Sequence, residues 1–430
     1  MEKTRREFVK LVGGAALGAG IMFAGRGKAE AQAKSLKGVP SEPVKIGVIS
    51  ILTGVGGLVG VDGLHGSEIW LEQTNAAGGI LGRKVEFYRE EETSPKETVE
   101  KFRKLTLQAK VDVITGVIST AVGLAIGPVA EELGQLLVSW DATTQKGVEE
   151  TMPKPKYMFR SFDNEQDAVA GAIMTAKHFP KIRTVAGINN DYSYGRDCWE
   201  TYKTVLSILN PNVKFVLDLW PKLGETEFSS HIAAIKKANP DLLMCSFWSG
   251  DIPIFVKQAA GAGLFKKIKG CFIACGGIYN YLKKEFTPEG LIMGYSNFYF
   301  KTIESWPLSK WFVKRYLEKY KEYPGYESDN AYFTLQAYKA AVEKCYAITG
   351  TWPTKEQIAA VLPGIEVPCP SGYRGYTEDN RQTCHVYQGI STHKNSYDFV
   401  TIDPVETFLS SEIMKPAGLT FYEWIKRWKS

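Results

Sequence analysis

Two adjacent hydroxyl side chains, Ser119 and Thr120, lie where a predicted strand (residues 111–115) is followed by a predicted helix (residues 121–133). Hydroxyl groups and the free amide hydrogens of a helix N-terminus together can bind an anion. A Ser-Thr pair in this place can also be an ordinary helix cap. Because ligands bind at the carboxyl ends of parallel strands in open α/β sheets, the position favours a ligand-binding role over capping alone.

The histidines and the glycine-rich turns lack the spacings that catalysis requires. None of the five histidines belongs to an HExxH pair, and no GxSxG motif occurs. The turn at residues 54–60 carries Val59 where the dinucleotide-binding fingerprint needs its third glycine. Zinc and iron–sulfur spacings are absent as well. We therefore expect a protein without catalytic residues, metal or cofactor, and an exported cofactor enzyme is the less favoured alternative.

The first residues resemble an export signal. Arg5 and Arg6 stand at the position of the paired arginines in a twin-arginine signal, and Ala31-Gln32-Ala33 supplies a small-residue cleavage pattern. The apolar run at residues 11–25 is shorter than the ~20 residues of a membrane-spanning helix, which disfavours a retained N-terminal anchor. Since no cysteine lies near the cleavage site, lipid anchoring is not expected. We expect cleavage after about Ala33 and a soluble protein in the periplasm.

Charge and composition narrow the class of protein further. Hydrophobic residues make up 44% of the chain and charged residues 23%, which is typical of a globular protein. Loss of residues 1–33 would remove six basic and three acidic side chains and lower the net charge from +5 to +2. Because no basic run with interleaved aromatic residues remains, we expect no nucleic-acid partner.

The seven cysteines form no CxxC pair. Cys271 and Cys275 lie in an apolar run that predicts a buried strand, so we interpret them as core thiols. Cys369 and Cys384 flank a polar, glycine-rich loop, and an oxidising compartment would allow them to form a disulfide. The sequence leaves that disulfide and two free thiols equally open.

Predicted strands and helices alternate along nearly the whole mature chain. After a linker at residues 34–43, the first series has strands at 44–50, 84–89, 111–115 and 136–139, and helices at 63–75, 95–108 and 121–133. The second series has helices at 166–179, 196–208, 228–239 and 253–263, and strands at 183–188, 213–219, 241–247 and 269–274. This alternation predicts an α/β protein of two doubly wound lobes with parallel sheets.

Later segments return to each lobe. Helices at 307–321 and 330–348 are expected to rejoin the first lobe, and strands at 384–390 and 399–401 to complete the second. We therefore assign residues 44–161 and about 292–375 to lobe 1, and residues 162–291 and about 376–430 to lobe 2. Short crossings between two rigid lobes predict a hinge.

Three segments carry a resemblance that covers nearly the whole mature chain. They are Asn75-Ala76-Ala77-Gly78-Gly79-Ile80-Leu81-Gly82-Arg83-Lys84, Asn239-Pro240-Asp241, and Gln258-Ala259-Ala260-Gly261-Ala262-Gly263-Leu264. With the order of elements, they resemble the branched-chain amino-acid and amide binding family of type I periplasmic binding proteins. The resemblance implies two lobes joined by a three-crossing hinge, a small-molecule ligand in the cleft between them, a monomer, and ABC permease subunits as partners.

The resemblance also implies which residues contact the ligand. The matched positions in the first lobe are Ser119, Thr120, Asp141, Ala142 and Thr143, and those in the second lobe are Tyr194, Trp248 and Gly276. Family members that bind amino acids commonly place an acidic residue where Gly276-Gly277 stands here. A buried ammonium needs an opposing charge, so a plain amino acid becomes a less favoured ligand unless Asp141 or Asp251 reaches the cleft.

We expect a carboxylate-bearing ligand: a branched-chain or aromatic amino acid, or a related organic acid, with the acid without an amine slightly favoured. The hydroxyls of Ser119, Thr120 and Thr143 would bind the carboxylate, and Tyr194 and Trp248 would cover an apolar body. The alternative is a ligand-sensing receptor of the same fold that binds a short amide or urea.

Overall fold

The computed structural model describes residues 36–430 except 142, 303, 380, 382–384 and 429–430. Its first sheet has five parallel strands in the order β2-β1-β3-β4-β5. These strands are β1 (Val44–Ser50), β2 (Val85–Glu91), β3 (Val113–Gly116), β4 (Leu137–Ser139) and β5 (Met158–Arg160). Every residue of β3, β4 and β5 is buried, as expected for parallel strands that helices cover on both faces.

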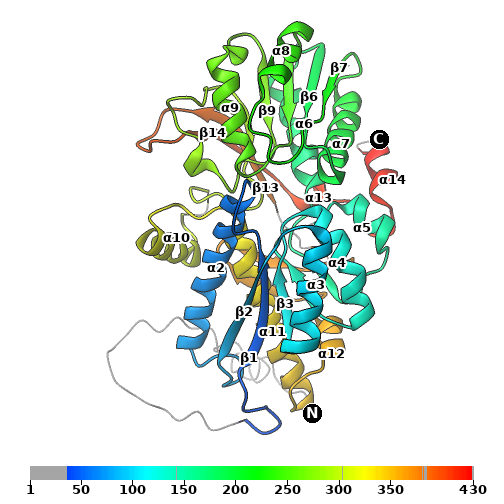
Figure 1. Ribbon diagram of the computed structural model, residues 1–430, viewed down its shortest axis with the longest axis vertical. Coiled ribbons are helices and arrows are strands. Elements are labelled where there is room, and N and C mark those ends of the chain that lie inside the picture. The colour runs from blue at the N-terminus through cyan, green and yellow to red at the C-terminus, as the bar shows by residue number, and fades with distance from the viewer. Residues whose placement is uncertain (1–35, 142, 303, 380, 382–384, 429–430) are drawn as a thin grey trace, which may run out of the picture. The chain divides into compact units, whose positions relative to one another are not determined.

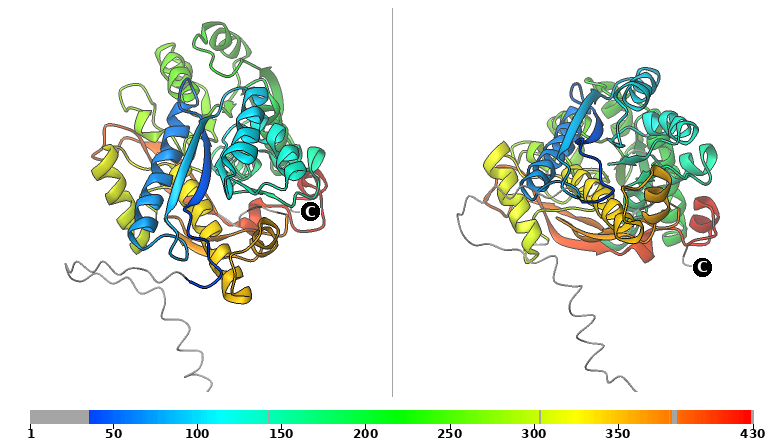
Figure 2. Two further views of the ribbon diagram at one scale, coloured as in Figure 1. Left: turned by 60° about the horizontal axis from the view of Figure 1, so that its bottom comes forward. Right: turned by 90° about the horizontal axis from the view of Figure 1, so that it is seen from below.

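Seven helices accompany this sheet in the described residues, and sheet and helices together are called lobe 1. They are α2 (Gly57–Ala76), α3 (Pro95–Arg103), α4 (Thr120–Leu133), α5 (Gln145–Thr151), α10 (Pro307–Tyr320), α11 (Tyr326–Thr349) and α12 (Lys355–Val361). A π-helical turn, Lys104–Ala109, follows α3. The long helix α11 runs beside α2 (Figure 2), so this late segment packs within lobe 1.

The second sheet has seven strands in the order β14-β13-β10-β9-β8-β6-β7. Its strands are β6 (Thr184–Ile188), β7 (Lys214–Leu219), β8 (Leu242–Cys245), β9 (Lys269–Phe272), β10 (Ile292–Gly294), β13 (Val386–Thr392) and β14 (Thr401–Phe408). The five strands from β7 to β10 are parallel, and β13 and β14 add to the edge in antiparallel pairing. These two late strands therefore complete the second sheet.

Helices α6 (Glu165–His178), α7 (Ser193–Leu209), α8 (Ser229–Ala238) and α9 (Asp251–Gly261) accompany the second sheet, and together they are called lobe 2 (Figure 1). Short 3₁₀ turns, Leu264–Lys266 and Tyr279–Tyr281, follow α9 and β9. At the end of the described chain, α13 (Ser410–Ile413) precedes α14 (Phe421–Lys426), and α14 contacts both α5 of lobe 1 and α7 of lobe 2.

Several predicted boundaries shift. The strand Ile292–Gly294 pairs with β9, so the chain returns to lobe 1 after this strand rather than at residue 292. Helix α2 begins at Gly57, six residues before the predicted start, because the glycine-rich turn enters the helix directly. A hairpin of β11 (Glu366–Cys369) and β12 (Gly372–Gly375), which the sequence did not predict, lies beside α11.

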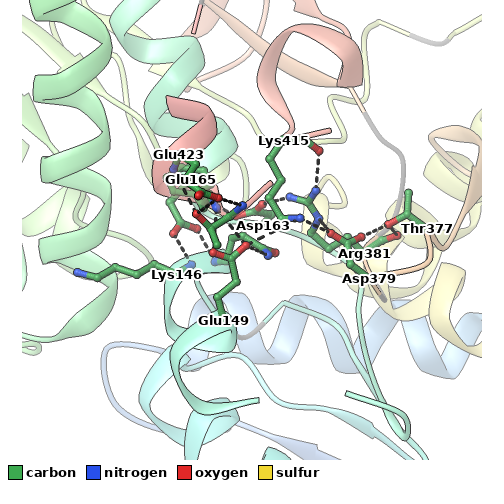
Figure 3. Close-up of polar contacts among 12 residues, drawn as sticks. Lys146, Glu149, Asp163, Glu165, Thr377, Asp379, Arg381, Lys415 and Glu423 are labelled. Carbon is green, nitrogen blue, oxygen red and sulfur yellow. Dashed lines mark hydrogen bonds and ion pairs between the residues drawn. The ribbon is translucent and has the colours of Figure 1, made fainter. Parts of the chain in front are cut away.

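Polar contacts join the segments that cross between the lobes, which run from β5 to α6, from β10 to α10 and from β12 to β13. Arg381 forms ion pairs with Asp163 at 2.8 Å and with Asp379 at 3.2 Å, and Lys415 contacts Asp379 at 3.0 Å (Figure 3). Arg374 is paired with Asp329 and also donates to the carbonyl oxygen of Ser161 at 3.1 Å. These bonds hold the first and last crossings together as one unit.

Some of the sequence-based expectations involve residues outside the described part of the chain. The export signal and its cleavage site, residues 1–33, lie outside it, and so does Cys384. Cys369 is described: its buried thiol lies 3.2 Å from the carbonyl oxygen of Gly372 and 3.3 Å from the hydroxyl of Ser371. The pairing of Cys369 with Cys384 stays a prediction. Within the described residues, no helix is long and apolar enough to cross a membrane.

Candidate ligand-binding site

A cavity lies between the two lobes and receives residues from both of them. Lobe 1 contributes Ile118, Thr120, Asp141 and Tyr326 to its wall, and the first crossing contributes Phe162 and Asn164. Lobe 2 contributes Asp167, Tyr192, Tyr194, Trp248, Ala274 and Ser296. The free space is narrow and has room for one or two water molecules. The lobes are thus drawn closely together around a narrow space.

The topology of the sheets explains why these residues meet. Most of them follow the carboxyl end of a parallel strand: Thr120 follows β3, Asp141 follows β4, Tyr194 follows β6 and Trp248 follows β8. In open α/β sheets this edge is where loops gather and ligands bind. Because the two sheets turn this edge toward one another, the strand ends of both lobes line a single cavity.

Four of the eight predicted contact residues line this cavity, namely Thr120, Asp141, Tyr194 and Trp248. Their side chains are almost completely buried, with exposed fractions of 1% for Thr120 and 6% for each of the other three. The structure therefore brings together hydroxyl, carboxyl and aromatic groups that are up to 128 positions apart in the sequence.

The other predicted residues do not line the cavity, and Ala142 lies outside the described residues. Thr143 is buried with a positive φ of 109° and its hydroxyl has no hydrogen-bond partner. Gly276 packs so closely against the backbone of Tyr295 that an added Cβ would lie 2.6 Å from its carbonyl oxygen, so this glycine serves chain packing. Ser119 is partly exposed at the N-cap of α4 and makes no side-chain capping bond.

A carboxylate of the protein itself lies beside the N-terminus of α4. The carboxylate of Glu92 accepts hydrogen bonds from the amides of Ile118 and Ser119, each at 2.8 Å. Both amides precede Thr120, the first residue of α4, so Glu92 takes two donors directly before the helix. That the amide hydrogens of the helix itself face a ligand's carboxylate stays a prediction.

Asp141 supplies a buried carboxylate to the cavity. Its Oδ2 accepts a hydrogen bond from the hydroxyl of Tyr326 at 3.0 Å, whereas its Oδ1 has no partner. Burial raises the pKa of Asp141 to about 7, and the nearby charge of Asp163 adds to the shift. Asp251, the other acid that could have filled this role, does not line the cavity but bonds to Asn190 and to the amide of Gly224.

A second acid, Asp167, faces the same cavity from the first turn of α6. Ser296 donates to its Oδ2 at 2.7 Å, and its Oδ1 has no partner. Burial raises the pKa of Asp167 well above its usual value, and the charges of Asp141 and Asp163 raise it further. The two lobes thus present one carboxyl group each, and none of the described residues that line the cavity is Lys, Arg or His.

Aromatic rings cover much of the remaining wall. Tyr192 and Tyr194 lie together with ring centroids 5.8 Å apart, and Phe162 and Tyr326 form a second pair at 6.0 Å. Trp248 completes the aromatic wall from lobe 2. An aromatic wall of this kind accommodates an apolar body, or a cation that lies over the face of a ring.

Sequence reasoning missed several residues of the wall, for different reasons. Tyr192 stood two positions before Tyr194 in the matched segment, so the segment was found but the second ring was not. Asp167 lies at the start of a predicted helix, where an acidic residue is usual for its stabilising effect on the helix dipole. Tyr326 starts α11, which was predicted to begin four residues later. No signal in the sequence pointed to Glu92.

Direct contacts between the lobes hold the cavity shut. The carbonyl oxygen of Val55 in lobe 1 accepts hydrogen bonds from the hydroxyl of Ser249 at 2.6 Å and from the amide of Gly250 at 3.0 Å, both in lobe 2. Near α5, the hydroxyl of Thr144 donates to Asp197 of α7 at 2.7 Å. The described conformation is therefore a closed one.

Comparison with known proteins agrees with this architecture. The family model described as periplasmic binding protein matches residues 43–390. The chain belongs to the periplasmic binding protein family. Among relatives of this periplasmic binding protein, Leu/Ile/Val-binding protein homolog 8 of Brucella melitensis is 25% identical over 351 residues, which cover 77% of this chain and 83% of the relative. The predicted resemblance to the branched-chain amino-acid branch of the type I proteins is thereby confirmed.

Solved structures confirm the predicted fold class. A solute-binding protein of an ABC transporter from Rhodopseudomonas palustris BisB5, in complex with 3,4-dihydroxybenzoic acid, aligns with a TM-score of 0.72 at 21% identity and covers 86% of this chain and 96% of its own. A leucine-binding protein from Thermotoga maritima aligns with a TM-score of 0.70 at 22% identity, and the alignment covers 84% of this chain and 98% of the Thermotoga chain. These relatives are solute-binding proteins rather than enzymes.

Proposed function

We propose that this periplasmic binding protein is the solute-binding component of an ABC importer, which captures a small organic ligand between its lobes and passes it to the permease. The observation that carries this proposal is the buried cavity, into which strand ends of both sheets bring polar atoms without partners. Buried polar groups are ordinarily hydrogen-bonded, so unpaired ones in a cavity between two lobes indicate a place for a ligand.

Within this proposal, Thr120, Asp141, Tyr194 and Trp248 contact the ligand. An amino acid, a related organic acid and a short amide all fit the proposed role. The names of the relatives support it, because one is called a Leu/Ile/Val-binding protein homolog and another was solved with an aromatic acid. We propose further that the protein acts as a monomer.

A ligand screen tests the proposal. Thermal-shift measurements over amino acids, short amides, urea, and branched or aromatic carboxylates should reveal a stabilising ligand. At a hundred times its dissociation constant, such a ligand adds about 2.7 kcal/mol to the free energy of unfolding. The ligand should also lower the radius of gyration in small-angle scattering, because the free lobes are expected to open.

Two tryptophans of lobe 2 provide a matched pair of variants. Trp248→Ala should weaken binding of the selected ligand at least tenfold, since Trp248 lines the cavity. Trp220→Ala should leave binding unchanged, because Trp220 lies outside the cavity and packs against Arg196. If no class of ligand stabilises the protein or changes its radius of gyration, the proposed function is wrong.

We also propose that the protein reaches the periplasm by twin-arginine export, for which Arg5, Arg6 and the Ala31-Gln32-Ala33 pattern are the support. Replacing both arginines by lysine should leave unprocessed precursor in the cytoplasm, because the paired arginines are the recognised feature of such signals. Immunoblots of cell fractions measure the outcome. Normal periplasmic accumulation of the double variant would contradict this route.

A further inference from the structure

We propose that the cavity recognises a small organic cation, whose protonated nitrogen donates hydrogen bonds to Asp141 and Asp167 and lies against the aromatic wall, and that a carboxylate on the ligand is dispensable. This inference rests on the proposed function and narrows the chemical class of its ligand.

The first support is the pair of unused acceptors. Oδ1 of Asp141 and Oδ1 of Asp167 have no hydrogen-bond partner, although the two side chains are only 6% and 3% exposed. A buried carboxylate oxygen without a donor is costly, and a charged donor is its strongest partner. A protonated amine carries up to three N–H groups and can serve both oxygens at once.

The second support is the lack of a cationic side chain in the described wall of the cavity. None of the described residues that line the cavity is cationic. Arg381 pairs with Asp163 and Asp379, and Arg374 pairs with Asp329. Arg160 is also buried, but it donates to Gln145 and does not line the cavity. A ligand's carboxylate would therefore meet two acids and no cationic side chain in the described wall, and Glu92 already takes the amides of Ile118 and Ser119.

The third support is the aromatic wall. Rings of Tyr192, Tyr194, Trp248, Phe162 and Tyr326 surround the same space as the two acids. The negative faces of aromatic rings attract a cation, and this attraction is strongest where water is excluded. An apolar alkyl or aryl group attached to the nitrogen would pack against the same rings.

The interaction between the two acids favours binding of a cation over binding of a neutral amide. The charge of Asp141 contributes to the raised pKa of Asp167, so the two carboxyl groups disfavour each other's ionisation. A neutral amide can donate hydrogen bonds but leaves that repulsion in place. A cation between them favours the ionised form of either carboxyl group, so it should bind more tightly than an amide of the same shape.

A matched ligand series on the unmodified protein tests the inference. The compounds are 3-methylbutylamine, leucine, 4-methylpentanoate and 4-methylpentanamide, and in parallel 2-phenylethylamine, phenylalanine, 3-phenylpropanoate and 3-phenylpropanamide. Each set shares one apolar body and varies only the polar groups. Calorimetry at pH 7.5 should show the better amine binding at least tenfold tighter than its matched acid and amide, and no weaker than its amino acid.

Isosteric variants then assign the effect to the two acids. Asp141→Asn and Asp167→Asn should each weaken binding of the better amine at least tenfold without weakening binding of the acid. Asp251→Asn is the control, because Asp251 is a buried acid of lobe 2 that does not line the cavity, and it should leave the affinity for the amine unchanged. Thermal unfolding shows whether each variant is folded. If a variant does not fold, the ligand series on the unmodified protein still tests the inference.

The outcomes separate this inference from the proposed function. An acid or amide that binds more tightly than its matched amine overturns the cation inference, as does an amine affinity that is the same in Asp141→Asn and the unmodified protein. If none of the eight compounds binds while the broader screen finds a ligand that closes the lobes, the cation inference fails and the proposed function stands. If no ligand of any class closes the lobes, the proposed function itself fails.

Discussion

The carboxylate of Glu92 lies beneath the N-terminus of α4, where the amides of Ile118 and Ser119 each donate to it at 2.8 Å. Burial raises the pKa of Glu92 to about 7 despite these two bonds, and the nearby charge of Asp141 also raises it. Glu327 of α11 lies close enough for the charge of Glu92 to raise its pKa in turn. Asp141, which lines the cavity, Glu92 and Glu327 thus form a group of acids in which neighbouring charges raise the pKa values of Glu92 and Glu327.

This raised pKa leads to a prediction about stability. An acid whose pKa is higher in the folded state is stabilising below its unfolded pKa, and its contribution is lost as the pH rises through the folded pKa. For Glu92 that window runs from about 4.5 to about 7. The difference in unfolding free energy between the unmodified protein and Glu92→Gln should therefore shrink by roughly 3 kcal/mol between pH 4.5 and pH 8.

Urea denaturation at several pH values measures this difference. The glutamine has one acceptor and one donor group, so it should cost stability at low pH by losing one amide bond, while its own contribution does not vary with pH. Glu86→Gln is the control, since Glu86 lies with an exposed side chain on β2, the strand that Glu92 directly follows. Parallel curves for Glu92→Gln and the unmodified protein would show that Glu92 does not titrate in this range.

At the scale of elements, the parallel strands and the residues that follow them were the predictable part of the site. Buried apolar runs such as Val113–Gly116 show a strand directly, and the position after the strand places Thr120 at the ligand edge of the sheet. Asp141, Tyr194 and Trp248 follow their strands in the same way. Local sequence is sufficient here, because strand ends of one sheet meet wherever the strands are parallel.

Contacts that join distant elements were not predictable in the same way. Tyr326 and Asp141, which are hydrogen-bonded, are 185 residues apart in the sequence. Glu92, which follows β2, is 26 residues from Ile118, whose amide it binds next to the N-terminus of α4. Neither contact leaves a periodic or spacing signal in the sequence, since each depends on how α11 and β2 pack against their neighbours. The cavity's position at the strand ends could therefore be expected from the sequence, whereas the polar partners that Tyr326 and Glu92 supply could not.

At the scale of the whole molecule, ligand affinity depends on how easily the lobes close. A ligand that binds only the closed state must also supply the free energy of closing, so bonds between the lobes contribute to its apparent affinity. Val55 accepts two such bonds, from the hydroxyl of Ser249 and the amide of Gly250. Neither Val55 nor Ser249 lines the cavity, so they can affect affinity without touching the ligand.

Ser249→Ala should therefore weaken ligand binding although the cavity is intact. The variant loses one hydrogen bond of the closed state, about 0.5–1.5 kcal/mol, while Gly250 still donates to Val55. This corresponds to a roughly 2- to 13-fold higher dissociation constant for any ligand that closes the lobes. Calorimetry measures the change, and small-angle scattering at saturation should give the same radius of gyration as the unmodified protein.

The control for this prediction is Ser207→Ala, which removes an exposed hydroxyl of α7 that contacts neither the other lobe nor the cavity. Its dissociation constant should match that of the unmodified protein. Because the Ser249 hydroxyl would be hydrated when the lobes separate, Ser249→Ala should change the stability of the ligand-free open state little. An unchanged dissociation constant in Ser249→Ala would mean that this bond is absent or unimportant in the ligand-bound closed state, and closure would then depend on the Thr144–Asp197 contact and on the ligand itself.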